Sequence, residues 1–241
     1  MRYLINMSYD GSKFYGYQIQ NNKRTVEGEI EKILSKVLNT KINTIASSRT
    51  DKAVHALNQY CHFDYDKKIN VKNLRHSLNS LIDDSIYIKK ISIVDDNFHS
   101  RYNVVKKQYV YKINMGEYDP INKDYIFQYN KKISKELLDV FVERMSGLHN
   151  FKSFTSDKDK DNYQRKLSLS YKIQNKILYL KFESSGFLRY MIRNIVGLLI
   201  DINENKKKIS DIDIIFKSED RTSCGLCASA CGLYLERIDF E

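Results

Sequence analysis

Hydrophobic residues follow regular spacings along nearly the whole chain. Near the N-terminus Tyr3, Ile5, Met7 and Tyr9 occupy every second position, which is typical of a strand. Apolar residues then recur every three or four positions behind Thr25, a residue type that often caps a helix at its start. Read in this way, the first half is predicted to form a strand over 3–9, a helix over 26–38, strands over 42–46 and 57–64, a helix over 71–81 and a strand over 86–94.

The second half repeats this order. It is predicted to form a strand over 109–114, a helix that Ser134 starts and Gly147 stops, strands over 167–173 and 177–183, a helix over 187–202, a short helix over 212–216 and a last strand over 233–240. The order β-α-β-β-α-β is that of a split ferredoxin-like or RRM-like unit. No linker rich in Pro or Gly separates the halves. We therefore predict an α+β protein with domains over 1–103 and 104–241, which share an antiparallel sheet with helices on one face.

Composition narrows the class of partner. The 241 residues include 40 Lys and Arg against 30 Asp and Glu, a formal net charge of +10, which favours binding to a polyanion although part of it reflects a general richness in Lys. The 18 Tyr suit stacking on bases as well as core packing. No apolar run is long enough to cross a bilayer, and the N-terminus lacks a signal-peptide pattern. We predict a soluble, cytoplasmic protein that does not bind a membrane.

Three cysteines lie close together near the C-terminus. Cys224, Cys227 and Cys231 have a spacing that invites a metal or cluster interpretation, but no nearby fourth ligand completes such a site. Their neighbours are small residues, as in a tightly packed segment where Cys serves as a small apolar side chain. We predict packing and no metal.

Candidate chemistry is concentrated at positions 46–56, which read Ala-Ser-Ser-Arg-Thr-Asp-Lys-Ala-Val-His-Ala. Asp51 follows Arg49 by two residues, and a guanidinium can hold a nearby carboxylate ionised, as a nucleophile or a base requires. Thr50 and His55 are further polar groups in the same segment. Local pattern alone favours a polar connection that carries a surface ion pair.

Further polar and aromatic groups stand in three other segments. Positions 98–111 combine basic residues, Lys107 among them, with Tyr109, which could stack on a base or move a proton, although packing is the simpler role for it. Arg189 and Arg193 lie four positions apart on one face of an otherwise apolar helix. Each guanidinium needs a partner or a place at the rim, because burying a lone charge is costly. Positions 220–235, which begin Asp-Arg and end Gly-Leu-Tyr-Leu, are expected to be structural.

Together with Tyr-Asp-Gly-Ser-Lys-Phe-Tyr-Gly-Tyr-Gln at positions 9–18, these segments resemble the motifs of the bacterial tRNA pseudouridine synthase A family. The resemblance runs through both halves, in the order and spacing of that family. Four positions depart from its pattern: Ser48 and Ala53 replace Gly, Tyr17 replaces Trp, and Ser229 replaces Pro.

The resemblance implies the pseudouridine synthase fold and conversion of uridine to pseudouridine, with tRNA positions 38 to 40 of the anticodon stem-loop as the ordinary target. It makes Asp51 catalytic, with Arg193 as its ion-pair partner and Tyr109 against the target base, while Arg49 helps to fill the space of the flipped base. The predicted substrate-binding residues are Arg49, Thr50, His55, Lys107, Tyr109 and Arg189.

The resemblance also implies a homodimer. An isomerisation gains and loses no atoms or electrons overall, so no metal or nucleotide cofactor is expected. The same chemistry on ribosomal RNA is one alternative, and a non-catalytic RNA-binding module is another. The presence of Asp51, Tyr109 and Arg193 together argues against the second, because a pure binder has no need of a paired carboxylate.

Overall fold

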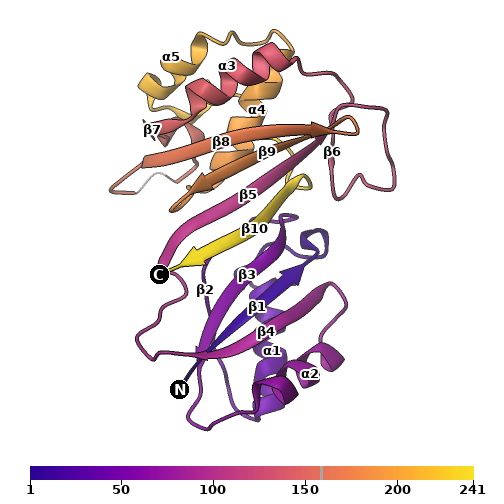
Figure 1. Cartoon of the computed structure of the whole chain (residues 1–241), viewed down its shortest axis with the longest axis vertical. Helices are drawn as coiled ribbons and strands as arrows, with labels where there is room; N and C mark the ends of the chain where they lie inside the picture. Colours follow the sequence, from indigo (N-terminus) through magenta and orange to yellow (C-terminus); the bar gives the residue numbers. More distant parts are fainter. Residues whose placement is uncertain (158–159) are drawn as a thin grey trace. The chain divides into compact units, whose positions relative to one another are not determined.

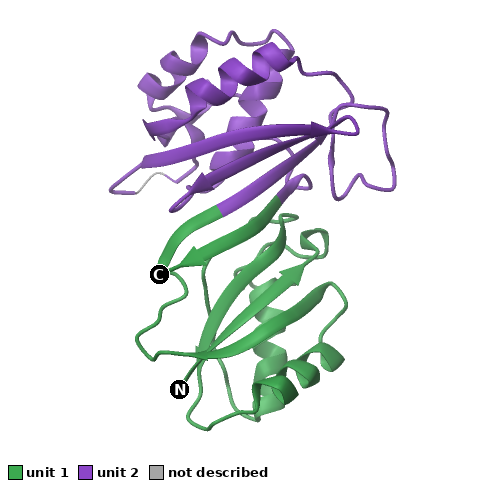
Figure 2. Cartoon of the chain, viewed as in Figure 1, with its two compact units in different colours: residues 1–107, 234–241 green, residues 108–233 purple. Residues whose placement is uncertain are grey.

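A computed structural model of the chain describes residues 1–157 and 160–241. It divides into two compact units, one of Met1–Lys107 with Tyr234–Glu241 and one of Gln108–Leu233 (Figure 2). Both boundaries fall inside strands, in β5 (Val104–Asn114) and in β10 (Leu233–Phe240). The predicted division, by contrast, falls at 103–104 and puts the whole terminal strand in the second domain. Alternation reveals that a strand exists but not which strand it pairs with, which is why the placement of β10 differs.

The first unit is a sheet with two helices. Its further elements are β1 (Arg2–Tyr9), the 3-10 turn η1 (Gly11–Lys13), α1 (Val26–Leu38), β2 (Ile45–Ala46), β3 (His55–Asp64), α2 (Val71–Leu81) and β4 (Ile86–Val94). The strand order is β4-β1-β3-β10, with β2 also on β3. β1 is antiparallel to both neighbours, so that Ile5 lies opposite Cys61 on one side and Ile91 on the other. β10 runs parallel to β3.

The core of this unit lies where the pattern predicts it. Tyr3, Ile5 and Met7 are fully buried, and α1 and α2 contact each other over the sheet. Thr25 caps α1 as predicted, since its side chain accepts a hydrogen bond from the backbone N–H of Gly28. The cap fixes the start of α1, and the spacing of Val26, Ile30, Ile33 and Leu34 gives the helix its single buried face.

One predicted strand in this unit is much shorter than expected. The strand predicted over 42–46 is reduced to the two residues of β2. The backbone N–H of Ile42 donates to Ser35 Oγ at 2.9 Å, and that of Thr44 donates to Glu31 Oε1 at 2.6 Å. These bonds to α1 replace the ladder bonds that a longer strand would make.

The second unit also consists of a sheet and helices. Its further elements are β6 (Phe127–Gln128), α3 (Lys135–Met145), β7 (Gly147–Asn150), the 3-10 turn η2 (Lys152–Phe154), β8 (Gln164–Gln174), β9 (Ile177–Ser184), α4 (Met191–Asn203), α5 (Asp211–Ser218) and α6 (Arg221–Cys224). The strand order is β5-β9-β8-β7, and β6 pairs with β5 in parallel. α3, α4 and α5 all lie on one side of β8 and β9 (Figure 1).

Two features of this unit bear on the predictions. Ser134 caps α3 as expected, with its Oγ accepting from the N–H of Leu137 at 3.2 Å. α4 begins at Met191 rather than at 187, because Tyr190 has a left-handed backbone with φ of 62°. The α+β class is confirmed, and the predicted elements occur in the predicted order, with β6, β7 and α6 in addition. In the described part of the chain no helix is both long and apolar enough to cross a membrane.

Candidate active site

The segment that carries Asp51 is a loop between β2 and β3, and polar contacts hold it at several points. The N–H of Ser47 donates to Tyr60 O at 2.9 Å. The buried amide of Gln59 donates to Ser48 O at 2.7 Å. Thr50 Oγ1 lies 2.7 Å from Tyr9 OH, and both side chains are buried. Thr50 is therefore part of the support of the loop.

The motif at positions 9–18 packs directly against this loop. A Cβ at Gly11 would collide with the carbonyl of Val54, so that only glycine fits there. Gly16 has φ of +106°, and a Cβ there would lie 3.0 Å from Thr50 O. The N–H of Tyr17 donates to the same carbonyl at 3.0 Å. Two segments that are separate in the sequence thus form one structure around Asp51.

Asp51 itself occupies a tight turn. Its carbonyl accepts from the N–H of Val54 at 3.1 Å, and Ala53 within the turn has a left-handed φ of 63°. Asp51 is half-buried, whereas Arg49 is exposed. The turn therefore carries a half-buried carboxylate, and an exposed guanidinium lies two residues before it in the sequence.

His55 follows the turn and is 2% exposed. Its Nδ1 accepts from the N–H of Gly11 at 3.1 Å and lies 3.3 Å from Asp10 Oδ1. The ring stacks on Tyr234 of β10 with centroids 4.7 Å apart. His55 thus supports the loop from within the unit.

Lys107 contacts the start of the same loop. Its Nζ donates to Ser47 O at 2.6 Å. Burial lowers the pKa of Lys107 to about 8, and the positive charge of Arg101 adds to this. The ammonium group of Lys107 is therefore held at the start of the loop and is only partly solvated.

In the second unit, two arginines flank one tyrosine. Arg189 Cζ lies 4.9 Å and Arg193 Cζ 5.3 Å from the centre of the Tyr190 ring, and Arg189 Nη2 donates to Tyr190 OH at 3.1 Å. Arg193 Nε donates to Ala228 O at 2.8 Å, and the N–H of Ala228 donates back to Arg193 O at 3.0 Å. Arg193 is thereby fixed at the first turn of α4.

The Asp-Arg motif of positions 220–235 packs against α4. Asn194, fully buried, donates from Nδ2 to Phe154 O at 2.7 Å and accepts on Oδ1 from Arg221 Nη2 at 2.8 Å. A Cβ at Gly197 would collide with the carbonyl of Leu226. The motif is structural, as expected, and the element that it stabilises is the helix that carries Arg193.

Comparisons with known proteins agree with these motifs. A family model described as tRNA pseudouridine synthase matches residues 5–103 and 142–241. This chain belongs to that family. A tRNA pseudouridine synthase A of Mycoplasma genitalium is 38% identical over 242 residues, which cover 100% of this chain and 99% of that protein. Proteins of the same name from Staphylococcus carnosus and Limosilactobacillus reuteri (strain DSM 20016) are 37% and 34% identical and cover 99% of this chain, with 90% and 96% of their own lengths matched.

The predicted site residues of this family member are divided between the units. The first unit holds Arg49, Thr50, Asp51, His55 and Lys107, and the second holds Tyr109, Arg189 and Arg193. Tyr109 is 6% exposed, and its ring meets the edge of Phe187 with centroids 5.2 Å apart. Lys107 and Tyr109 lie between the two segments that match the family model. The ion pair of Asp51 with Arg193 stays a prediction.

Four supporting residues were not predicted from the sequence: Tyr9, Gln59, Phe187 and Tyr190. Gln59 lies within a predicted strand, but its complete burial, which means that its amide must find partners, is seen only in the structure. Nothing in the sequence marked Tyr190 as a supporting residue.

One of the three clustered cysteines lies in the interior of the second unit, and the other two are partly exposed. Cys224 is fully buried, its Sγ lies 3.6 Å from Asn194 O, and burial raises its pKa to about 12. Among residues 1–157 and 160–241, no group of three His, Cys, Asp or Glu side chains is placed to hold a metal ion.

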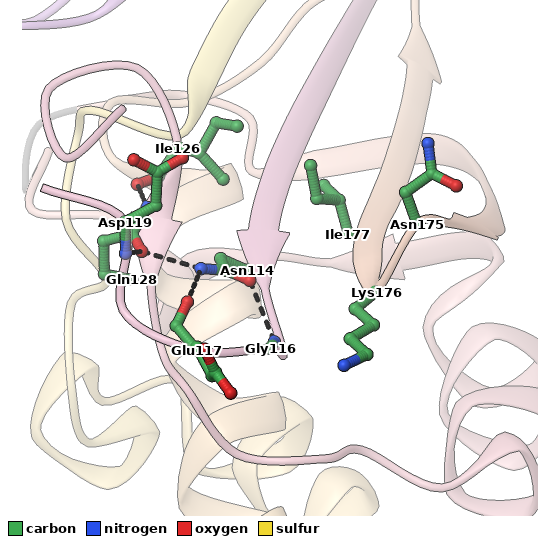
Figure 3. A pocket seen from close by; sticks show the side chains of 9 residues that line it. All are labelled: Asn114, Gly116, Glu117, Asp119, Ile126, Gln128, Asn175, Lys176 and Ile177. Atoms are coloured by element: carbon green, nitrogen blue, oxygen red, sulfur yellow. Dashed lines mark hydrogen bonds between the residues drawn. The ribbon is translucent and has the colours of Figure 1, made fainter. Parts of the chain in front are cut away.

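A pocket of about 230 Å³ in the second unit is unrelated to these residues (Figure 3). Asn114 Nδ2 donates to Glu117 O at 2.6 Å and to Gln128 Oε1 at 2.7 Å, and Gln128 Oε1 also accepts from the N–H of Asp119. These bonds fold the loop after β5 back on the strand. The pocket walls are thus engaged in holding the loop, and none of the predicted site residues lines it.

Proposed function

We propose that this protein converts uridine to pseudouridine in tRNA, at positions 38 to 40 of the anticodon stem-loop. The observation that carries the proposal is the turn that presents Asp51, held by the 9–18 motif in a chain that matches the family over almost its whole length. A binding module would not need a half-buried carboxylate on so constrained a turn.

The reaction rearranges one nucleoside. The bond between C1′ and N1 breaks, the uracil turns, and C1′ bonds to C5, which loses its proton while N1 gains one. Asp51 serves as the nucleophile or the base, and either route requires its ionised form. We assign Arg193 to hold that charge and Tyr109 to lie against the base and move the proton.

Binding of the RNA falls to the basic residues. We assign Arg49, which is exposed beside Asp51, to the space left by the flipped uridine, and Lys107 and Arg189 to phosphates. Thr50 and His55, predicted to bind substrate, are buried, and we propose that they act by positioning the loop.

The test is incubation of the purified protein with unmodified tRNA transcripts and with ribosomal RNA, followed by site-resolved mapping of pseudouridine. Modification of the anticodon arm at positions 38 to 40 is expected. Modification of ribosomal RNA with the anticodon arm untouched would refute the substrate assignment and leave the chemistry intact. Absence of any modification, with the RNA still bound, would favour the binding-module alternative.

We further propose that the enzyme is a homodimer that works in the cytoplasm, where its substrate is found. One tRNA is large compared with a single 241-residue chain, so a second copy would extend the binding surface. Light scattering at micromolar concentration should give twice the mass of the chain, and a monomer mass with full activity would contradict the dimer.

A further inference from the structure

The segment that follows β4 in the first unit is attached to the strand that leads into the Asp51 loop. Ser100 is fully buried, and its Oγ donates to Ile45 O of β2 at 2.6 Å. The same hydroxyl lies 2.7 Å from Nδ1 of His62, which is 1% exposed. The residues on either side of Ser100 are therefore held in a fixed position next to the entry of the loop.

Tyr102, two residues further on, presents a rigid aromatic surface. Its side chain is 77% exposed, yet its ring stacks on His99 with centroids 4.2 Å apart and an angle of 27° between the planes. His99 is fixed in turn, because its Nδ1 accepts the backbone N–H groups of Arg101 at 3.1 Å and Tyr102 at 3.3 Å. One face of the Tyr102 ring is thus held by protein, and the other is open to solvent. A pre-organised ring loses little conformational entropy when it stacks on a ligand.

Positive charge accompanies this ring. Arg101 is exposed, and within the described part of the chain its guanidinium makes no hydrogen bond or ion pair. Its charge contributes to the lowered pKa of Lys107, so the two cationic groups lie close enough to repel each other. Lys107 Nζ in turn contacts Ser47 O at the start of the loop. A phosphate bound by the guanidinium of Arg101 would also be attracted by the charge of Lys107.

We propose that Tyr102, Arg101 and Lys107 form a binding site for one unpaired nucleotide of the RNA substrate. The base stacks on the open face of Tyr102, and its phosphate contacts Arg101, with the charge of Lys107 adding to the attraction. Stacking on an aromatic side chain is indifferent to the identity of the base, so this site positions the RNA and does not read its sequence. The inference rests on the proposed function and adds a nucleotide next to the one that reacts.

The experiment measures the affinity for unmodified tRNA with Asp51→Asn as the background, so that binding is separated from turnover. Adding Tyr102→Ala should raise Kd about 5- to 150-fold, the equivalent of about 1–3 kcal/mol of stacking energy. Tyr102→Phe and Tyr102→Trp should stay within about threefold, because both keep a stacking face. Tyr87→Ala is the matched control, a tyrosine of β4 that is 49% exposed, and should leave Kd unchanged.

The salt dependence of tRNA binding tests the proposed contact between Arg101 and a phosphate. Arg101→Ala should reduce the slope of log Kd against log salt concentration by about 0.7–0.9, the value for one lost phosphate contact. In the otherwise native enzyme, Tyr102→Ala should raise KM and leave kcat within about twofold, as expected of a positioning residue.

Several outcomes would overturn the inference. Equal Kd for Tyr102→Ala and the Asp51→Asn background would do so, as would an aromatic substitution as harmful as alanine. A change of oligomeric state in light scattering, with unchanged Kd, would assign the surface to a second copy instead. Failure of the proposed function is distinguishable, because it would appear as a lack of pseudouridine with the unsubstituted enzyme.

Discussion

Replacing Lys107 by methionine should stabilise the protein at neutral pH. Burial and the charge of Arg101 lower the pKa of Lys107 from 10.5 to about 8, so protonation favours the unfolded state. Below pH 8 both states carry the proton and the penalty is complete. Between pH 8 and 10.5 the folded state loses its proton first, and the penalty is progressively removed as the pH rises. The shift in pKa corresponds to a destabilisation of the folded state by about 3 kcal/mol, and about 2 kcal/mol of this is removed when the pH rises from 7 to 10.

The assay is urea unfolding followed by far-UV circular dichroism, since the chain contains no Trp. The free energy of unfolding of Lys107→Met minus that of the wild type should decrease by about 2 kcal/mol from pH 7 to pH 10. Lys107→Arg is the matched control, because neither arginine nor methionine titrates in this range, so the free energies of unfolding of the two variants should differ by the same amount at pH 7 and pH 10. A pH-independent difference between Lys107→Met and the wild type would refute the reasoning. The methionine variant should also bind tRNA more weakly, since it lacks the cation at Ser47 O.

Three further substitutions test the packing. Ala53 has a φ of 63°, and a residue with a Cβ pays about 1 kcal/mol to adopt this left-handed conformation. Ala53→Gly removes that strain but adds the backbone entropy of glycine to the unfolded state, so Tm should stay unchanged or rise slightly. The same substitution should widen the range of tRNA positions that are modified. Gly197→Ala should lower stability by about 1–3 kcal/mol, because its Cβ would collide with Leu226 O; a Tm equal to that of the wild type would contradict the close approach. Tyr17→Phe should be neutral or stabilising by about 1 kcal/mol in urea unfolding, because the buried hydroxyl lies against Cys61 without a hydrogen bond of normal geometry.

Much of the fold follows from the sequence because each element has a local cause. The alternation in β1 and the Thr25 cap of α1 are sufficient to predict those elements within one or two residues. The parallel pairing of β10 with β3 could not be predicted, because it depends on contacts between residues that are far apart in the chain, such as Tyr234 opposite His55. The shortening of β2 has the same origin, because the backbone N–H of Thr44 donates to Glu31 Oε1 on α1.

The candidate site was only partly predictable. The motif containing Asp51 could be found because its residue types are chemically distinctive, and glycines such as Gly11 mark where two backbones approach. Burial was not visible in the sequence. His55 was predicted to bind substrate from its place in the motif, whereas the structure surrounds it with Gly11 and Tyr234. A one-dimensional motif does not distinguish a residue that touches the substrate from one that supports such a residue.

The most direct test of the account is the turnover of Asp51→Asn on an unmodified tRNA anticodon arm, with pseudouridine mapped at each position and tRNA affinity measured in parallel. The account predicts that affinity is retained and that pseudouridine formation is lost, because no other group replaces the carboxylate. Residual turnover within tenfold of the wild type, a change in barrier of about 1.4 kcal/mol or less, would contradict the assignment of Asp51 as the catalytic residue.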